Sequence, residues 1–308
     1  MASNPSSSRP AVGVALVVGS CLSLPFGAAV AAQLFPALGA WGVTSLRIGL
    51  AAVLLLVFVR PRVRGWTRRQ WGAAVLFGVS LAGMNGFFYA GIERVPLGPA
   101  VAIEFLGPLI LAAVLTRRLL DGMWVGIALI GMALLGLDGM LGAEPLDLLG
   151  VFFILIAAGF WVFYIRMSAR VGEAIPGSGG LVVGLLAASV LLLPVGIPTV
   201  AAVGASGDMS LLLLALLTAV LSSVIPYSFE LAALRRLPQR VFGVLLSLEP
   251  AFATLAGWLV LGQSATPLKL LAIGLVVAAS VGTALGARRD ARGAEPPPFT
   301  GTIPVVPN

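Results

Sequence analysis

Four ionisable side chains lie inside long apolar stretches of the sequence, and they are the residues best placed to do chemistry. They are one cation, Arg47, and three carboxylates, Glu104, Glu230 and Glu249. A charge is costly in hydrocarbon, so each side chain is expected to face a bundle interior, a water-filled cavity or a partner. Arg47 with Glu104 or Glu249 is compatible with binding a zwitterion, because a cation attracts a carboxylate and an anion attracts an ammonium.

The position of each charge along its stretch predicts its role. At a rise of about 1.5 Å per residue, Arg47 and Glu104 lie about 10 Å below the outer membrane face, where they can pair. A purely structural ion pair, or an Arg47 that reaches outward, is the alternative. Glu249 lies about 13 Å from the cytoplasmic end, near the midplane, a depth that suits a substrate or proton site. Glu249 and then Glu104 are therefore candidate proton carriers.

Glu230 precedes Arg235 by only five residues. Its carboxylate can therefore meet an arginine at the cytoplasmic interface, which predicts a gating or structural role.

Two prolines mark expected helix interruptions. Pro250 follows Glu249 and Pro108 follows Gly107, and each proline removes a backbone donor and frees a carbonyl group. Interrupted helices at matching positions of two halves point to a binding site, which assigns Pro108 and Pro250 a gating or structural role. The alternative is a packing kink, with Glu249 bonded to a neighbouring helix.

Two uncharged polar residues complete the candidate substrate site. Asn85 and Tyr227 lie within apolar stretches and are expected to line a cavity with Arg47, Glu104 and Glu249. The alternative is that they form hydrogen bonds between helices, which is a frequent role of polar residues in membranes.

The sequence predicts neither a cofactor nor a metal. It contains no histidine and one cysteine, Cys21, which leaves little material for a zinc or haem site. Motifs for ATP, dinucleotides and catalytic zinc are also absent from it. If the protein moves a solute against its concentration gradient, the energy would therefore come from an ion gradient.

The elements that must position these residues are membrane helices. Hydrophobic residues make up 59% of 308 positions and charged residues 10%, and the mean hydropathy is +1.06. Backbone groups in lipid need internal partners, and no barrel pattern is present, so the chain is predicted to be an all-α polytopic membrane protein. Its Ser-, Pro- and Gly-rich tails, 1–10 and 288–308, are predicted to be disordered. The ten expected spans are 11–31, 41–59, 71–91, 98–116, 122–139, 148–165, 180–203, 210–234, 241–261 and 268–287.

The distribution of arginine predicts the orientation. The net charge of +7 is scattered between apolar stretches, unlike the single basic face of a nucleic-acid binder. The chain is placed in a bacterial inner membrane with both termini in the cytoplasm. Of the Lys and Arg residues in its loops and tails, only Arg94 and Lys269 then lie on the outer side, as the positive-inside rule predicts. The inner residues are Arg9, Arg60, Arg62, Arg64, Arg68, Arg69, Arg117, Arg118, Arg166, Arg170, Arg235, Arg236, Arg240, Arg288, Arg289 and Arg292.

The first stretch also has features of a cleavable signal peptide, namely Arg9, an apolar run and a small-residue segment at 28–32. Without this first helix, the later loops would no longer have their arginines on the cytoplasmic side. The stretch is therefore expected to remain uncleaved.

A weak internal repeat divides the chain. An ungapped shift of 142 positions aligns Phe87, Ala90, Arg94, Pro96, Leu106 and Pro108 with Phe229, Ala232, Arg236, Pro238, Leu248 and Pro250. This predicts two five-helix repeats, 11–139 and 140–287, of which the second is inverted because five is odd. Such repeats are typical of secondary transporters. Chance identity in an apolar chain is the alternative.

Two segments carry a family resemblance. SSVIPYSFELAALRRLPQRVFGVLLSLEPAFATLAGWLVLGQ (Ser222 to Gln263) and YAGIERVPLGPAVAIEFLGPL (Tyr89 to Leu109) resemble bacterial threonine/homoserine exporters of the EamA-type drug/metabolite transporter superfamily. The resemblance implies amino-acid export. It has one departure, because the family often ends the ninth span in LGE, whereas Gln263 follows Leu261 and Gly262 here.

The leading hypothesis is therefore a proton-coupled exporter of a small metabolite, such as threonine or homoserine, that works by alternating access and is not an enzyme. Its expected partners are the substrate, protons and the lipid bilayer, without nucleic acid, and its oligomeric state is left open. A cationic drug or other metabolite exporter is the first alternative. An intramembrane enzyme on a lipid-linked substrate and a channel are alternatives of other classes.

Overall fold

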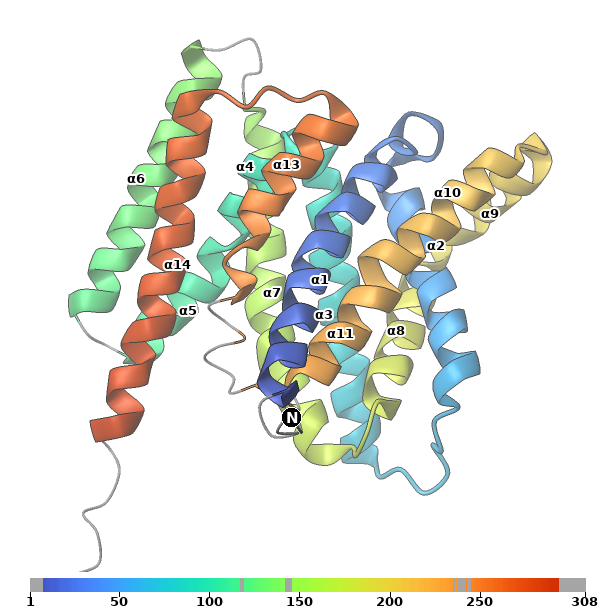
Figure 1. Cartoon of the computed structure of the whole chain (residues 1–308). Coiled ribbons are helices and arrows are strands. Elements are labelled where there is room, and N and C mark those ends of the chain that lie inside the picture. The colour runs from blue at the N-terminus through green and yellow to red at the C-terminus, as the bar shows by residue number, and fades with distance from the viewer. Residues whose placement is uncertain are drawn as a thin grey trace, which may run out of the picture.

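The computed structural model describes residues 8–116, 119–141, 146–234, 236–237, 242 and 245–293, and within them every regular element is a helix. Figure 1 shows these helices side by side in one bundle. Their bounds are α1 Ser8–Ala32, α2 Phe35–Val59, α3 Arg68–Ile92, α4 Leu97–Glu104, α5 Leu106–Thr116, α6 Leu119–Leu141, α7 Leu148–Ala174, α8 Gly179–Leu191, α9 Leu193–Ser206, α10 Met209–Ala219, the π-helical turn η1 Val220–Val224, α11 Ile225–Leu234, α13 Glu249–Leu261 and α14 Pro267–Gly293.

Five of these helical segments are long and apolar enough to cross a membrane, and the bent pair α8–α9 would make a sixth. The five are Ala11–Ala32, Phe35–Val59, Arg68–Ile92, Leu148–Ala174 and Met209–Glu230. Shorter apolar helices occupy Leu97–Leu111, Gly122–Leu135, Glu249–Leu261 and Pro267–Ala279. Five of the ten expected ranges therefore overlap candidate spans, 180–203 overlaps the bent pair, and the other four overlap shorter apolar helices, so the expected count of ten spans stays a prediction.

The ends of the chain differ in part from expectation. α1 already begins at Ser8 and α14 continues to Gly293, so each predicted tail begins or ends inside a helix. Residues 1–7 and 294–308 of those tails lie outside the described residues.

Helix ends follow local capping chemistry. Thr67 and Gln70 form a reciprocal capping box at the start of α3, and Asp147 and Asp208 accept backbone N–H bonds at the starts of α7 and α10. Gly262 ends α13 at φ 65°, a left-handed conformation that glycine adopts without a steric penalty.

Breaks in the helices occur at related positions. Phe105 separates α4 from α5, and the turn at Ser247 and Leu248 precedes α13. Phe105 and Ser247 are 142 positions apart, which is the spacing of the sequence repeat. Pro108 and Pro250 lie in the first turns of α5 and α13, where a missing backbone donor costs little.

One expected span is not straight. The range 180–203 contains α8 and α9, whose axes differ by 79° across Leu192. Pro194 lies in the first turn of α9 and cannot donate a backbone hydrogen bond to α8. The bend therefore lies next to Pro194, which lacks the backbone N–H that a continuous helix over this range would use as a donor.

Several contacts of helices α1–α6 have counterparts among helices α7–α14. α2 packs against α8, α4 against α13, and α6 against α14. The contacts of α3 and α4 with α7 have counterparts in the contacts of α11 and α13 with α1. In Figure 1 α1 begins at the lower edge, whereas α7 ends there.

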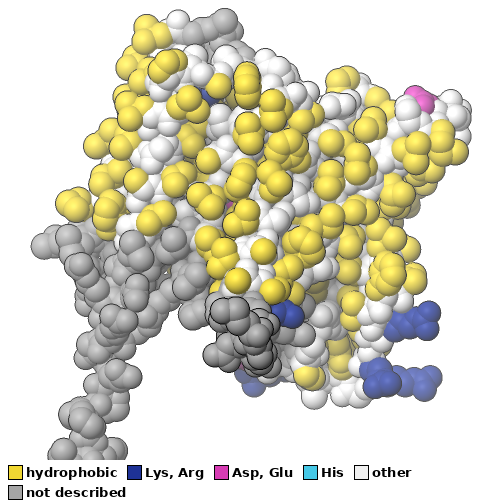
Figure 2. All heavy atoms as spheres, in the orientation of Figure 1, with side chains coloured by type: hydrophobic (Ala, Val, Ile, Leu, Met, Phe, Trp, Pro, Cys, Tyr) yellow, Lys and Arg dark blue, Asp and Glu magenta, His cyan; other side chains and the backbone are white. Residues whose placement is uncertain are grey.

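Small residues allow this close packing. A Cβ on Gly78 of α3 would lie only 2.6 Å from the carbonyl oxygen of Gly184 on α8. Figure 2 shows an apolar outer surface with most visible Lys and Arg side chains along its lower edge. An apolar exterior of this kind suits a lipid environment.

Candidate functional site

Arg47 is the centre of a polar cluster in the bundle interior. Its side chain on α2 is 1% exposed. Nη1 donates to the carbonyl oxygen of Ser222 at 3.0 Å, and Nη2 donates to Oδ1 of Asn85. The guanidinium carbon lies 4.6 Å from the ring centroid of Tyr89, a distance at which the ring face attracts a cation. One side chain therefore joins α2, α3 and η1.

Asn85 and Tyr227 belong to the same cluster. Asn85 donates from Nδ2 to the Leu81 carbonyl oxygen at 2.7 Å, which leaves its Oδ1 to accept from Arg47. Tyr227 on α11 lies beside Asn85 and within electrostatic range of Arg47 and Tyr89. We call Arg47, Asn85, Tyr89, Ser222 and Tyr227, with Ser223 included as the next residue of η1, the Arg47 cluster.

The three carboxylates form a second group. Glu104 and Glu249 are buried, and Glu249 is within electrostatic range of both Glu104 and Glu230. Glu230 accepts a hydrogen bond from Ser20 of α1 at 2.9 Å. Among the described residues, the carboxyl groups of Glu104 and Glu249 form no hydrogen bond. We call Glu104, Glu230 and Glu249 the carboxylate cluster.

Of the two expected ion pairs, one is not seen among the described residues, and the other involves a residue that lies outside them. Arg47 and Glu104 interact over a distance, yet Arg47 bonds to neutral oxygens of Ser222 and Asn85 instead of to the carboxylate. Glu230 bonds to Ser20, and its expected partner Arg235 lies outside the described residues. The sequence interval along one chain did not show which neighbouring helix would supply the nearest polar atom.

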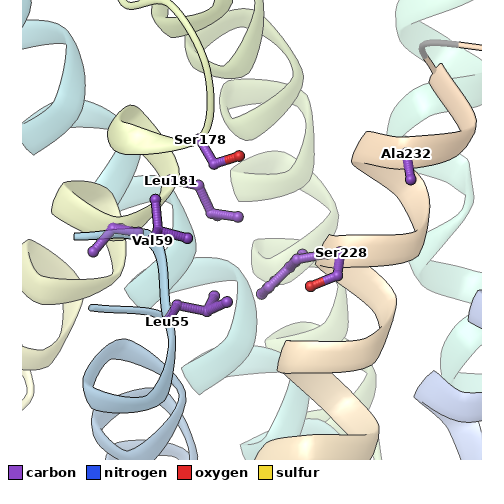
Figure 3. A pocket seen from close by; sticks show the side chains of 8 residues that line it. Leu55, Val59, Ser178, Leu181, Ser228 and Ala232 are labelled. Atoms are coloured by element: carbon purple, nitrogen blue, oxygen red, sulfur yellow. The ribbon is translucent and has the colours of Figure 1, made fainter. Parts of the chain in front are cut away.

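A cavity of about 220 Å³ lies between α2, α8 and α11 (Figure 3). Leu55 and Val59 line it from the end of α2, Ser178 and Leu181 from the start of α8, and Tyr227 with Ser228 from α11. Tyr227 is therefore shared by the cavity and the Arg47 cluster. A larger hollow of about 530 Å³ between α13 and α14 is almost wholly apolar and contains none of the candidate residues.

At the opposite end of the bundle, polar contacts join the start of α4 to the end of α13 and the loop after α3 to the start of α7. Oε1 of Gln263, which follows α13, accepts from the backbone N–H of Leu97 on α4 at 3.0 Å. Arg94 pairs with Asp147 at 3.2 Å. The N–H of Gly150, the Arg94 guanidinium and the N–H of Leu149 hold the pKa of Asp147 below its usual range, so this carboxylate stays charged.

Tyr89, Ser20 and Ser222 are site residues that the charge pattern did not single out. Tyr89 follows Asn85 by four residues, and this spacing places both on one face of α3. That spacing was an available signal. Ser222 stands in an apolar stretch as a polar residue that could line a cavity, but its backbone contact with Arg47 could not be predicted, because every residue has a carbonyl group. In the described residues no group of three or more His, Cys, Asp or Glu is arranged to hold a metal ion.

The chain is similar to known transporters. The profile of the EamA-like transporter family matches residues 148–285. The threonine/homoserine exporter RhtA of Escherichia coli (strain K12) is 39% identical over 279 residues, covering 91% of this chain and 93% of the relative. The exporter of the same name from Salmonella typhimurium (strain LT2) is 41% identical over 268 residues, covering 87% and 90%.

A solved structure shares the fold. It is described only as the crystal structure of a protein, and it matches with a TM-score of 0.58 at 20% identity over 92% of this chain and 99% of its own. The curated relatives are named as exporters and not as enzymes, so the chain is a transporter and the intramembrane-enzyme alternative falls away. On this similarity along nearly its whole length, the chain belongs to the EamA-like transporter family.

Proposed function

We propose that the protein exports a small amino acid, threonine or homoserine, across the bacterial inner membrane by proton-coupled alternating access. The observation that carries this proposal is a buried guanidinium with no carboxylate bonded to it, within electrostatic range of Glu104, one of the three members of the carboxylate cluster. The names of the relatives supply the substrate class.

The Arg47 cluster suits the substrate carboxylate. Nη1 and Nη2 each bond to a neutral oxygen, and Nε has no partner in the structure. The Nε edge of a guanidinium can donate to a carboxylate, and this charge-assisted bond is stronger than a bond between neutral groups. The carboxylate of the substrate would thereby also balance the positive charge of Arg47.

The carboxylate cluster suits the ammonium group and the coupled proton. Glu249 has two other carboxylates within electrostatic range, and neighbouring like charges make it costly to keep all three ionised. A bound ammonium and a bound proton relieve the same repulsion. Competition between them would couple export of the amino acid to proton entry.

The two-fold pattern of contacts supports rocking of two inverted repeats, 11–139 and 140–287. The break between α4 and α5 at Phe105 follows Glu104, and the turn that begins 142 residues later at Ser247 precedes Glu249. The family profile matches 148–285, which nearly equals the second repeat. Interrupted helices at the interface of inverted repeats are typical of substrate sites in secondary transporters.

The cavity and the contacts at the opposite end of the bundle support an inward-facing state. With both termini in the cytoplasm, the cavity beside Tyr227 lies on the cytoplasmic side and the Gln263–Leu97 contact on the outer side. Substrate would enter from the cytoplasm and pass Tyr227 to reach Arg47. A cationic drug fits this route less well, because Arg47 would repel it.

Transport in proteoliposomes tests the proposed function. Purified protein with its cytoplasmic side outward should accumulate labelled threonine when the lumen is acidic, and an uncoupler that removes the gradient should abolish the accumulation. Unlabelled homoserine should compete. Liposomes without protein are the control, and equal threonine levels in both preparations would refute the proposal.

Reporter fusions test the proposed topology. Fusions after Trp66 and Arg236 should report the cytoplasm, and fusions near Glu144 and Gly207 should report the outside, because arginine-rich loops stay inside. An outside result at Arg236 would contradict two inverted five-helix repeats.

A further inference from the structure

Three buried polar atoms in the Arg47 cluster have no hydrogen-bond partner. They are Nε of Arg47, Oη of Tyr89 and Oγ of Ser223. The side chain of Arg47 and the residues Tyr89 and Ser223 are all at most 1% exposed. Burying a polar group without a partner is costly, so a group of atoms left in this state calls for an occupant.

Tyr89 contacts Arg47, and Ser223 adjoins a residue that bonds to Arg47. The carbonyl oxygen of Ser222 accepts from Arg47, and Ser223 is the next residue on η1. The ring of Tyr89 lies against the guanidinium of Arg47. A single π-helical turn, such as η1, shifts the direction of its side chains, and such turns often occur at functional sites.

The unpartnered atoms differ in what they can bind. Nε of Arg47 only donates and is suited to a carboxylate. The hydroxyl groups of Tyr89 and Ser223 each donate and accept, so their best common partner is a group that also does both. A carboxylate only accepts and an ammonium only donates, whereas an alcohol group satisfies both hydroxyls.

We propose that Tyr89 and Ser223 form a subsite for the side-chain hydroxyl of the substrate, so that the exporter selects hydroxylated amino acids over analogues in which a methyl group replaces the hydroxyl. The inference rests on the proposed function and adds the basis of its specificity. In this arrangement Arg47 holds the carboxylate while the two hydroxyls recognise the side chain.

Competition against labelled threonine uptake tests the subsite in the wild-type protein. Valine is the methyl isostere of threonine, and norvaline is that of homoserine. Because an isostere leaves buried hydroxyls unpaired, valine and norvaline should each compete roughly tenfold or more weakly than their hydroxylated counterparts. Equal competition by both members of each pair, alongside normal threonine transport, would overturn the inference.

Two variants locate the selectivity. Tyr89→Phe and Ser223→Ala should each weaken competition by unlabelled threonine and leave competition by valine unchanged. Each variant should therefore have a lower selectivity for threonine over valine than the wild type. Ser80→Ala is the matched control, because the Ser80 hydroxyl is buried on α3 and already donates to the Phe77 carbonyl oxygen at 2.7 Å. This control variant should keep the wild-type selectivity for threonine over valine.

The outcomes separate this inference from the proposed function. If both variants weaken threonine and valine by the same factor, Tyr89 and Ser223 support the site without reading the hydroxyl, and the inference is wrong. If the wild-type protein shows no saturable threonine transport, the proposed function itself fails.

Discussion

Arg47→Ala is expected to reduce threonine transport at least about a hundredfold, because it removes the cation that binds the substrate carboxylate. The same change removes the donors to Ser222 and Asn85 and the cation that lies on Tyr89. Initial rates of labelled threonine uptake into proteoliposomes measure the effect, with the amount of folded protein determined by size-exclusion chromatography.

Arg47→Lys separates charge from geometry. Lysine keeps a positive charge, yet a single ammonium cannot reproduce the fork that donates to Ser222 and Asn85 while leaving Nε for the substrate. It should fold better than the alanine variant and transport threonine more slowly than the wild type.

Arg94→Ala is the control for loss of an arginine. Arg94 is 43% exposed in its pair with Asp147, and exposed ion pairs contribute about 0–1 kcal/mol. Transport by this variant should stay within about twofold of the wild-type rate. An Arg47→Lys protein with wild-type transport kinetics would remove the guanidinium from the proposed site.

Glu249→Gln is expected to abolish threonine accumulation driven by a pH gradient. The amide keeps the shape of the carboxyl group but cannot take up or release a proton at this position. Exchange of labelled for unlabelled threonine needs no net proton movement, so the variant should retain measurable exchange. Loss of gradient-driven accumulation with exchange retained is the result expected only if Glu249 carries the coupled proton.

Two other glutamates complete this experiment. Glu173→Gln is the matched control, because Glu173 is an exposed residue of α7 outside the carboxylate cluster, and it should accumulate threonine normally. Glu230→Gln tests the neighbour that bonds to Ser20. If Glu249→Gln accumulates threonine like the wild type, Glu249 is not the coupling group and Glu104 becomes the candidate.

The helical fold could be predicted from the sequence because its physical cause is local. Every backbone polar group in lipid needs a partner, and within one continuous apolar stretch only a helix supplies it. The helix interruptions beside Pro108 and Pro250 were predictable for a similar reason, since proline removes a backbone donor wherever it stands. The 79° bend before Pro194 had the same cause, but its direction depends on how α9 packs against α2.

The membership of the site could be predicted only in part. Arg47, Asn85 and Tyr227 were expected together because polar residues avoid lipid, and the structure brings them into one cluster. The bonding within that cluster was not predictable. Arg47 bonds to Ser222 and Asn85 and not to Glu104, because helices η1 and α3 bring neutral oxygens to the guanidinium.

The sequence by itself determined that the chain is a helical membrane protein, which stretches form its helices and which charges must be sheltered from lipid. These properties depend on hydropathy and on backbone hydrogen bonding, which act over one helix at a time. Only the tertiary structure decided that Tyr89 lies against Arg47, that the buried hydroxyls of Tyr89 and Ser223 have no partner, and that Glu230 bonds to Ser20. These contacts join residues up to 210 positions apart, and they depend on the shapes with which small side chains let helices approach one another.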